Sequence, residues 1–399
     1  MIGILTYHGA YNFGANLQVL SSVGYLRKKG LDPIIINWIP QDLEAGYNRS
    51  IPKVQLEEHQ NFFKEHYPLT RLCRTNEDIV EVIEENNIES IIIGSDALIQ
   101  HKPLLSRIRL SKKGISIKEK RSNTIYPNPF WGSFLEGVDK KISVSLMSVS
   151  SQNTSYKIIR GGLRRRMKNT LLSFDKVTVR DRWTERMVRY LTRGKIQADL
   201  TPDPVFSFNQ NIDIQLSKEE ILRKFNLKDG YILISIKNPN IISESWMKSF
   251  GELAARHDLS VVYLSMPIGL IASKSSRNII PLPLSPLEWY GIIKYSAAYI
   301  GENMHPIVVA LHNSVPFFSF DSYGLKILKY FVNNKSSKTY DILMTAGFLD
   351  NRVSILGRNY SCPEPQEVMD KLLKFDKEKC TTFSKHQVNK YRAMMEELV

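Results

Sequence analysis

Residues 296–324, SAAYIGENMHPIVVALHNSVPFFSFDSYG, place a strand, a turn, a helix and a second strand within one short stretch. The apolar run 297–300 predicts a buried strand, 306–312 a helix with proline in its first turn, and 315–320 the next strand. This order is the unit from which doubly wound parallel sheets are built. The stretch therefore predicts an α/β fold.

His305 lies at the turn where this helix is predicted to begin. In doubly wound sheets, ligands bind beyond the carboxyl ends of the strands, where helix N-termini offer free N–H groups to an anion. A histidine at that point can give or take a proton on a bound anion. Helix capping or a local hydrogen bond explains the residue equally well, so this stretch alone leaves the role of His305 open.

The same alternation of elements starts at the N-terminus, with a strand at 2–7, a helix at 17–29 and a strand at 33–38. The loop between the first strand and the helix contains two glycines and the candidate ligand-binding residues His8, Asn12 and Asn16. The loop has no GxGxxG pattern, so the dinucleotide fingerprint is absent.

Polar side chains also follow two later strands. Ser95 and Asp96 come after the apolar run 90–93, and Arg180 comes directly after the predicted strand 176–179. An arginine at a strand end can hold a carboxylate or a phosphate through its planar guanidinium group. A structural ion pair of Arg180 with Asp181 or Asp203 is the alternative.

The length of 399 residues exceeds what one hydrophobic core usually serves, which predicts two domains. Thr201–Pro204 forms a stiff turn, after which the strand and helix rhythm restarts. We therefore expect Rossmann-like α/β domains at 1–205 and 206–364 that face a cleft, the first on the acceptor side and the second on the donor side. Two helices within 365–399 are expected to follow, and they could cross back to the first domain. The basic segment 102–120 is expected to be an irregular surface loop.

Charge indicates the class of partner. The chain has 54 Lys and Arg against 40 Asp and Glu, a net charge of +14, which favours anionic partners such as nucleic acid, phospholipid headgroups or phosphorylated small molecules. The segment 157–168, KIIRGGLRRRMK, contains only basic charges. It is interpreted either as a helix that contacts an anionic membrane surface or as a solvated helix face. No zinc-finger, helix-turn-helix or RRM signature accompanies it, so nucleic acid is not an expected partner.

The sequence also indicates the compartment. No run reaches the eighteen or so apolar residues of a membrane span, and the N-terminus is not that of a signal peptide. The three cysteines, Cys73, Cys362 and Cys380, have no metal-ligand or CxxC spacing and indicate reduced thiols. We expect a cytoplasmic protein without a metal site.

Several of these segments, in this order, resemble the polysaccharide pyruvyl transferase family. The matching parts are Tyr7-His8, Asn12 to Ala15, Leu17-Gln18, Ile91 to Asp96, Val177 to Asp181, Asp203-Pro204, Met304 to Pro306 and Asn313 to Phe318. The resemblance spans residues 3 to about 324 and implies a GT-B-like fold. It also implies transfer of pyruvate from phosphoenolpyruvate onto two hydroxyls of a sugar, with no cofactor beyond this co-substrate.

The resemblance assigns roles residue by residue. His305 would be the catalytic acid or base, and Arg180 would hold the carboxylate or phosphate of the donor. The N-terminal loop with His8, Asn12 and Asn16, together with Ser95 and Asp96, would face the acceptor sugar.

One position departs from the family pattern. Members often have arginine two residues before the histidine, where this chain has Asn303. Asparagine can hydrogen-bond a phosphate oxygen but adds no charge, so Lys237 or Lys326 could supply the donor-binding cation instead. Loss of activity, with sugar binding retained, is the other consequence to consider.

Two other functions remain open at this point. One is a GT-B glycosyltransferase that uses a nucleotide sugar, with Asp321 as the nearest candidate for a ribose contact; the other is a non-catalytic protein of a polysaccharide-assembly complex. For the transferase, the expected acceptor is a lipid-linked oligosaccharide at the inner membrane face, a precursor of a capsule or exopolysaccharide. A 4,6-ketal on galactose is the specific expectation.

Overall fold

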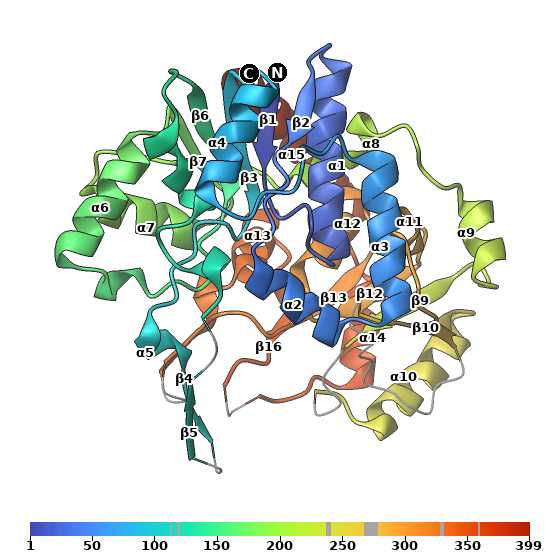
Figure 1. Cartoon of the computed structure of the whole chain (residues 1–399). Coiled ribbons are helices and arrows are strands. Elements are labelled where there is room, and N and C mark those ends of the chain that lie inside the picture. Colours follow the sequence, from blue (N-terminus) through green and yellow to red (C-terminus); the bar gives the residue numbers. More distant parts are fainter. Residues whose placement is uncertain (112–113, 118–119, 237–240, 267–277, 328–330, 358–359) are drawn as a thin grey trace.

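The computed structural model describes residues 1–399 except 112–113, 118–119, 237–240, 267–277, 328–330 and 358–359. Two parallel six-stranded sheets form its centre, with strand orders β2-β1-β3-β6-β7-β8 and β11-β10-β9-β12-β13-β16 (Figure 1). Strands of the first sheet come from residues 2–200 and strands of the second from residues 231–354. This is the predicted pair of Rossmann-like α/β units, arranged as in GT-B-like proteins.

The first sheet and its helices follow the alternation expected from the sequence. The elements of this half are β1 (Ile2–Leu5), α1 (Phe13–Lys28), β2 (Pro33–Ile35), α2 (Gln41–Ser50), α3 (Lys53–His66), α4 (Asn76–Glu85), β3 (Ser90–Asp96), α5 (Leu104–Arg107), β4 (Ile108–Ser111), β5 (Gly114–Ile117), β6 (Ser143–Val149), α6 (Gly161–Leu172), β7 (Lys176–Val179), α7 (Arg182–Thr192) and β8 (Asp199–Leu200). Of these strands, β4 and β5 form a separate two-stranded sheet.

The second sheet repeats the pattern after two connecting helices, α8 (Phe208–Asn211) and α9 (Lys218–Lys224). The elements of this half are β9 (Tyr231–Ser235), α10 (Glu244–Arg256), β10 (Ser260–Leu264), β11 (Ile279–Ile280), α11 (Pro286–Lys294), β12 (Ala298–Gly301), α12 (Met304–His312), β13 (Phe317–Asp321), β14 (Leu325–Ile327), β15 (Phe331–Asn333), α13 (Lys338–Ala346) and β16 (Arg352–Ser354), followed by α14 (Pro365–Leu373) and α15 (Lys377–Leu398). Of these strands, β14 and β15 form a separate two-stranded sheet.

The central strands read as continuous apolar runs because helices cover both faces of each sheet. Every residue of β1 (IGIL) and β9 (YILIS) is buried. The largest hydrophobic cluster contains residues of both halves, for example Phe13 of α1 and Trp289 of α11, whose rings stack with centroids 5.5 Å apart. The two sheets therefore share apolar packing beside the site described below.

The C-terminal helix α15 crosses back onto the first sheet, as the sequence suggested. Glu397 forms an ion pair with Lys176 of β7 (2.7 Å), and Tyr391 packs edge-on against Tyr25 of α1. Both chain termini consequently lie at the same end of the molecule (Figure 1). No helix within the described residues is long and apolar enough to cross a bilayer.

The segment 102–120 differs from its prediction as an irregular loop. Its described residues form the short helix α5 and an antiparallel hairpin of β4 and β5. The alternation in IRLS and ISI, with Gly114 at φ +112° beginning the second strand, is the local signal for a hairpin. The many lysine and arginine residues of the segment instead favoured the interpretation as an irregular surface loop.

Candidate active site

The site is organised around the first turn of α12. The helix starts at Met304, with Asn303 at the N-cap, so His305 is its second residue and Pro306 its third. Proline is tolerated there because a first-turn N–H has no partner within the helix. The Nε2 atom of His305 is buried and meets no hydrogen-bond partner among the described residues. This nitrogen therefore keeps an unused hydrogen-bonding capacity that a ligand could satisfy.

The N-terminus of α1, from the first sheet, packs directly against His305. A methyl group added to Gly14 would lie 2.1 Å from Cγ and 2.4 Å from Nδ1 of the imidazole. Asn12 caps this helix by accepting a hydrogen bond from the Ala15 N–H at 3.3 Å. Two helix N-termini, one from each sheet, thus converge at the histidine, and each adds partial positive charge.

Arg180 follows β7 and reaches two carboxylates. Its guanidinium nitrogens lie 2.6 Å from Oδ2 of Asp203 and 2.9 Å from Oδ1 of Asp96, and its side chain is 3% exposed. Gln18 of α1 donates a further hydrogen bond to Asp203 at 2.6 Å. Asp181, the other partner considered from the sequence, instead caps α7 by accepting from the Thr184 N–H. The ion pair with Asp203 therefore exists, and Asp96 is a second partner.

Lys338, the first residue of α13, is a site residue that the sequence did not reveal. Its Nζ lies 3.6 Å from Oδ1 of Asp96, and its side chain is only 10% exposed. The Ser337 hydroxyl caps α13 by accepting hydrogen bonds from backbone N–H groups of its first turn, which fixes where the helix begins. The polar stretch 333–341 has no apolar periodicity, so the only available signal was the Ser-Lys start of a helix.

The charged and titratable side chains at the site, His305, Asp96, Arg180 and Lys338, shift one another's pKa values. Burial raises the pKa of Asp96, but the charges of Lys338 and Arg180 and the hydrogen bond from the Ala97 N–H outweigh burial and hold the pKa below its usual value. Burial lowers the pKa of His305, and Arg180 and Lys338 lower it further, against the opposing effect of Asp96 and Asp203. Burial likewise lowers the pKa of Lys338, assisted by the charge of Arg180. The free site therefore favours a neutral imidazole beside an ionised Asp96.

Three further residues predicted to bind the donor, Asn303, Lys237 and Lys326, belong to the second half of the chain. Asn303 donates through Nδ2 to Sδ of Met266 (3.0 Å) and accepts from the Tyr323 hydroxyl (3.2 Å), which orients its amide. Lys326 is exposed on β14. Lys237 lies outside the described residues.

The candidate acceptor residues of the first half differ in their surroundings. His8 is fully buried, and its Nε2 lies 2.9 Å from Oδ1 of Asn37. Asn16 is also fully buried and donates to the carbonyl oxygens of His8 and Ala10, both at 3.1 Å. Both residues therefore shape the loop that carries the exposed Asn12.

At the end of β3, Ser95 is 2% exposed and donates to the carbonyl of Ser148. Asp96, the next residue, reaches the cluster of charges around Arg180 and Lys338. Of the two residues predicted at this strand end, Asp96 is thus the one that pairs with Arg180 and Lys338 in the described part of the chain.

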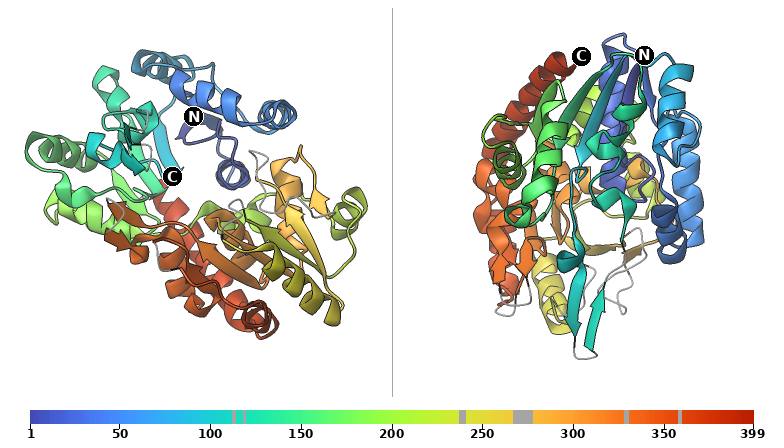
Figure 2. Two further views of the ribbon diagram at one scale, coloured as in Figure 1. Left: turned by 90° about the horizontal axis from the view of Figure 1, so that it is seen from below. Right: turned by 60° about the vertical axis from the view of Figure 1, so that its left-hand side comes forward.

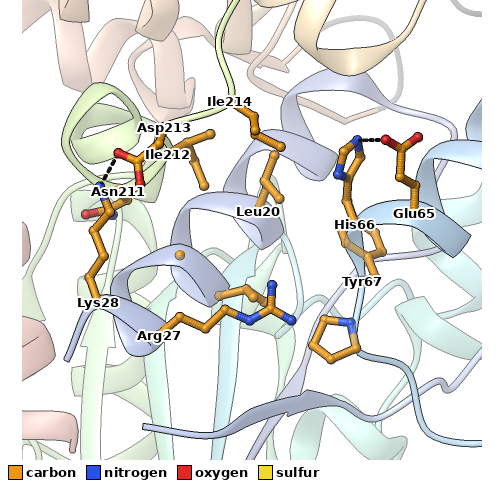
Figure 3. A pocket seen from close by; sticks show the side chains of 13 residues that line it. Leu20, Arg27, Lys28, Glu65, His66, Tyr67, Asn211, Ile212, Asp213 and Ile214 are labelled. Atoms are coloured by element: carbon orange, nitrogen blue, oxygen red, sulfur yellow. Dashed lines mark hydrogen bonds and ion pairs between the residues drawn. The ribbon is translucent and has the colours of Figure 1, made fainter. Parts of the chain in front are cut away.

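A separate hollow of about 450 Å³ lies along the outer side of α1 (Figure 3). Its lining includes Leu20, Arg27, Lys28, His66 and Ile214. Lys28 forms an ion pair with Asp213 at 2.6 Å, and His66 approaches Glu65 at 3.8 Å. This hollow contains none of the residues of the cluster at His305.

The fold and the site together define a two-sheet, GT-B-like α/β protein in which a half-buried histidine and two cations, Arg180 and Lys338, lie where two helix N-termini meet. Among solved structures, three UDP-GlcNAc 2-epimerases share this fold at 11–12% identity. The Rickettsia bellii structure has a TM-score of 0.54 and covers 100% of this chain and 95% of its own. The Methanocaldococcus jannaschii structure has a TM-score of 0.53, covering 96% and 98%. The Neisseria meningitidis structure, bound to UDP-GlcNAc, has a TM-score of 0.53, covering 100% and 98%.

The sequence itself identifies the family. The model of the family described as polysaccharide pyruvyl transferase matches residues 12–323, so the chain belongs to this family of pyruvyl-transferring enzymes. The matched segment contains Gly14, Asp96, Arg180 and His305, whereas Lys338 lies beyond it. No curated protein matches the sequence closely enough to be counted as a relative.

Proposed function

We propose that the protein transfers pyruvate from phosphoenolpyruvate to two hydroxyls of one sugar unit, forming a cyclic ketal and releasing phosphate. Membership of the family supports pyruvyl transfer onto a polysaccharide. The observation that carries the proposal is the unpartnered, buried Nε2 of His305 beside the ionised cluster of Arg180, Asp96 and Lys338. A proton carrier and two cations are what this donor requires.

The first step adds a sugar hydroxyl across the enol double bond of the donor. The hydroxyl oxygen bonds to C2 as its proton passes to His305, whose lowered pKa makes the neutral base available at neutral pH. In the same step the electron pair of the double bond takes up this proton at C3 through the imidazole, so one histidine serves as base and as acid and no carbanion is left at C3. The product is a tetrahedral phospho-ketal at C2.

The second step closes the ring. The bond from C2 to the phosphate oxygen breaks, the second sugar hydroxyl bonds to C2, and the proton of that hydroxyl leaves with the phosphate. Negative charge grows on the departing phosphate, and Lys338 and Arg180, together with the N-termini of α1 and α12, lie where they would stabilise it. In this scheme Lys338 supplies the cation that Asn303 lacks, while Lys237 and Lys326 remain additional candidates.

For the acceptor, we propose the terminal galactose of a lipid-linked oligosaccharide, modified as a 4,6-ketal at the cytoplasmic membrane face. The net charge of +14 suits an enzyme that works beside anionic lipid. On α6, Arg165 and Arg166 are exposed, whereas Arg164 bonds to the carbonyl of Tyr190 and stacks on its ring. Asn12, which is exposed, and Asp96 would face the sugar, and the buried His8, Asn16 and Ser95 would support the loop and the strand end that carry them.

A nucleotide-sugar glycosyltransferase is less well supported. Asp321, the candidate for a ribose contact, is fully buried, pairs with Arg352 at 2.8 Å and accepts from the Ser337 hydroxyl at 2.6 Å. Its carboxylate is therefore already satisfied within the protein. The presence of Lys338 also weakens the case for a non-catalytic protein, because the site keeps a second cation despite Asn303.

The test is phosphate release from phosphoenolpyruvate, measured with and without lipid-linked or aryl-tagged galactosides, with mass spectrometry of the sugar. Acceptor-dependent release, a product mass increased by one pyruvate ketal and loss of both in His305→Ala would establish the reaction. A thermal shift with a nucleotide sugar and no phosphate release with any acceptor would move the assignment to a glycosyltransferase. Sugar binding without turnover would indicate the non-catalytic role.

A further inference from the structure

The β4–β5 hairpin is a projection that the reaction scheme does not use. In the described part of the chain its two strands pair only with each other. Figure 1 and the right panel of Figure 2 show it extending beyond the rest of the molecule. All residues of β5, Gly114–Ile117, are exposed. Such an isolated hairpin gains little stability from its own packing, which points to a role in contact with something else.

The register makes the hairpin amphipathic. Ile108 lies opposite Ile117, and Leu110 lies opposite Ile115, which places these four positions on one face. Ile115 is 75% exposed and Ile117 is 57% exposed, the two most exposed large apolar side chains in the described chain. Ile115 and Ile117 therefore present an exposed aliphatic face on β5.

The sequence around this face is strongly basic. Between residues 107 and 121 the only acid is Glu119, and the basic residues are Arg107, Arg109, Lys112, Lys113, Lys118, Lys120 and Arg121. Lys120 and Arg121, just after the hairpin, are exposed. Aliphatic side chains framed by lysine and arginine are the composition of segments that bind the interface of anionic membranes. The segment contains no aromatic residue, which argues against single-stranded nucleic acid as its partner.

We propose that this hairpin docks on an anionic phospholipid bilayer, with Ile115 and Ile117 inserted at the level of the headgroups and with basic residues of the segment, among them Lys120 and Arg121, bound to the lipid phosphates. The hairpin is joined to the site by residues 97–107, which follow Asp96 at the end of β3. Docking would hold this end of the first sheet near the membrane surface. The inference rests on the proposed function only in giving this position a purpose, namely access to a lipid-linked acceptor.

Vesicle flotation of the full chain tests the docking surface without any substrate. The wild-type protein is expected to float with vesicles of phosphatidylglycerol and phosphatidylcholine and to bind phosphatidylcholine vesicles much more weakly. Ile115→Ser/Ile117→Ser should weaken binding at least about tenfold, because two exposed aliphatic side chains lose their contact with lipid. The matched control is Ile214→Ser/Leu373→Ser, which replaces side chains that are 53% and 49% exposed elsewhere and should bind as the wild type does.

Charge reversal tests whether the hairpin or the basic helix α6 makes the main contact with the lipid. Lys120→Glu/Arg121→Glu should weaken vesicle binding and its dependence on salt, whereas reversal at Arg165 and Arg166 should have the smaller effect. Unchanged binding by the isoleucine double variant, or loss of binding only on reversal in α6, would overturn the proposal. So would sedimentation velocity showing a wild-type dimer that the isoleucine double variant dissociates, because the face would then contact a second copy.

Turnover distinguishes this inference from the proposed function. With a water-soluble galactoside, the isoleucine double variant should keep wild-type turnover; with a lipid-linked acceptor in vesicles, its turnover should fall. Vesicle binding without any phosphate release would sink the proposed function and leave the docking surface standing. Turnover on both acceptors with no vesicle binding would overturn the docking surface and leave the proposed function standing.

Discussion

Gly14 and His305 lie in contact across the junction of the two sheets, with room for a hydrogen but not for a methyl group: a Cβ at position 14 would lie 2.1 Å from the imidazole Cγ. The N-terminal turn of α1 thereby fixes where the ring of His305 can sit. Backbone of the first half thus positions the proposed proton carrier of the second half.

Gly14→Ala is therefore expected to lower turnover by at least about tenfold, because the imidazole or the start of α1 must shift and proton transfer depends on position. The fold should persist, as judged by circular dichroism. In a helix, alanine normally stabilises by up to about 1 kcal/mol relative to glycine. Gly251→Ala in α10, where an added Cβ meets nothing within 4 Å, is the matched control and should keep full turnover. Equal turnover in both variants would show that the contact with His305 is not required.

The pH dependence of kcat/KM tests the state of His305 in the free enzyme. Burial lowers the pKa of the imidazole below its ordinary value of 6.5, so the neutral base is lost only as the pH falls through that lowered pKa. The profile of the wild-type enzyme should therefore have an acidic limb below pH 6.5 and rise with pH through it. A rate that instead increases on acidification would mean that the free enzyme must start with a protonated histidine, which contradicts the proposed order of proton transfers.

Lys338→Met tests the cation that replaces the missing arginine. Methionine keeps an unbranched stem but removes the charge, so the KM for phosphoenolpyruvate is expected to rise by about tenfold or more, roughly 1.4 kcal/mol of binding. Lys335→Met, at an exposed position three residues earlier, should leave the KM unchanged. An unaltered KM in Lys338→Met, with a lowered melting temperature, would assign the lysine to stabilising Asp96 alone.

Much of this arrangement could be predicted from local sequence. Apolar runs such as IIIGSD and KVTVRD reveal where a strand ends and a polar residue follows, and the carboxyl ends of parallel strands share one edge of a sheet. That reasoning found Asp96 and Arg180 as strand-end residues but named only Asp181 and Asp203 as ion-pair partners of Arg180; the structure adds Asp96, at 2.9 Å. Sequence reasoning could not identify Lys338, because its approach to Asp96 depends on packing between distant segments. The burial of His8 and Asn16 could not be predicted either, for the same reason. From sequence alone, an asparagine whose amide hydrogen-bonds the carbonyl groups of its own loop cannot be distinguished from one that binds a sugar.

Two substitutions of Arg180 are needed to separate its contribution to stability from its proposed contribution to donor binding. Arg180→Ala leaves Asp203, with 0% side-chain exposure, and Asp96 without their shared cation, and removing one partner of a buried ion pair costs about 3–5 kcal/mol. Its melting temperature should therefore fall sharply. Arg180→Lys keeps a charge but not the fork that spans both carboxylates, so it should fold and show a raised KM for the donor. A stable Arg180→Ala variant with an unchanged KM would remove the residue from both roles.

The lowered pKa values of several histidines predict how the stability of the protein depends on pH. Burial lowers the pKa of His59 to about 4 and of His312 to about 3, and it also lowers the pKa of His8, His101 and His305. Below pH 6.5 the unfolded chain therefore binds more protons than the folded protein, so stability falls as the pH falls.

Each such histidine contributes a slope of about 1.4 kcal/mol per pH unit between 6.5 and its folded pKa. Urea titrations from pH 8 to 4 should show little slope from this source above pH 7 and a steep one below it. His312→Asn, which removes one titrating ring, should lower the stability at pH 7 but flatten the acidic slope. An acidic slope identical to that of the wild type would mean that His312 is protonated in the folded protein as readily as in the unfolded chain, contrary to its burial beside Ser384 and Asn209.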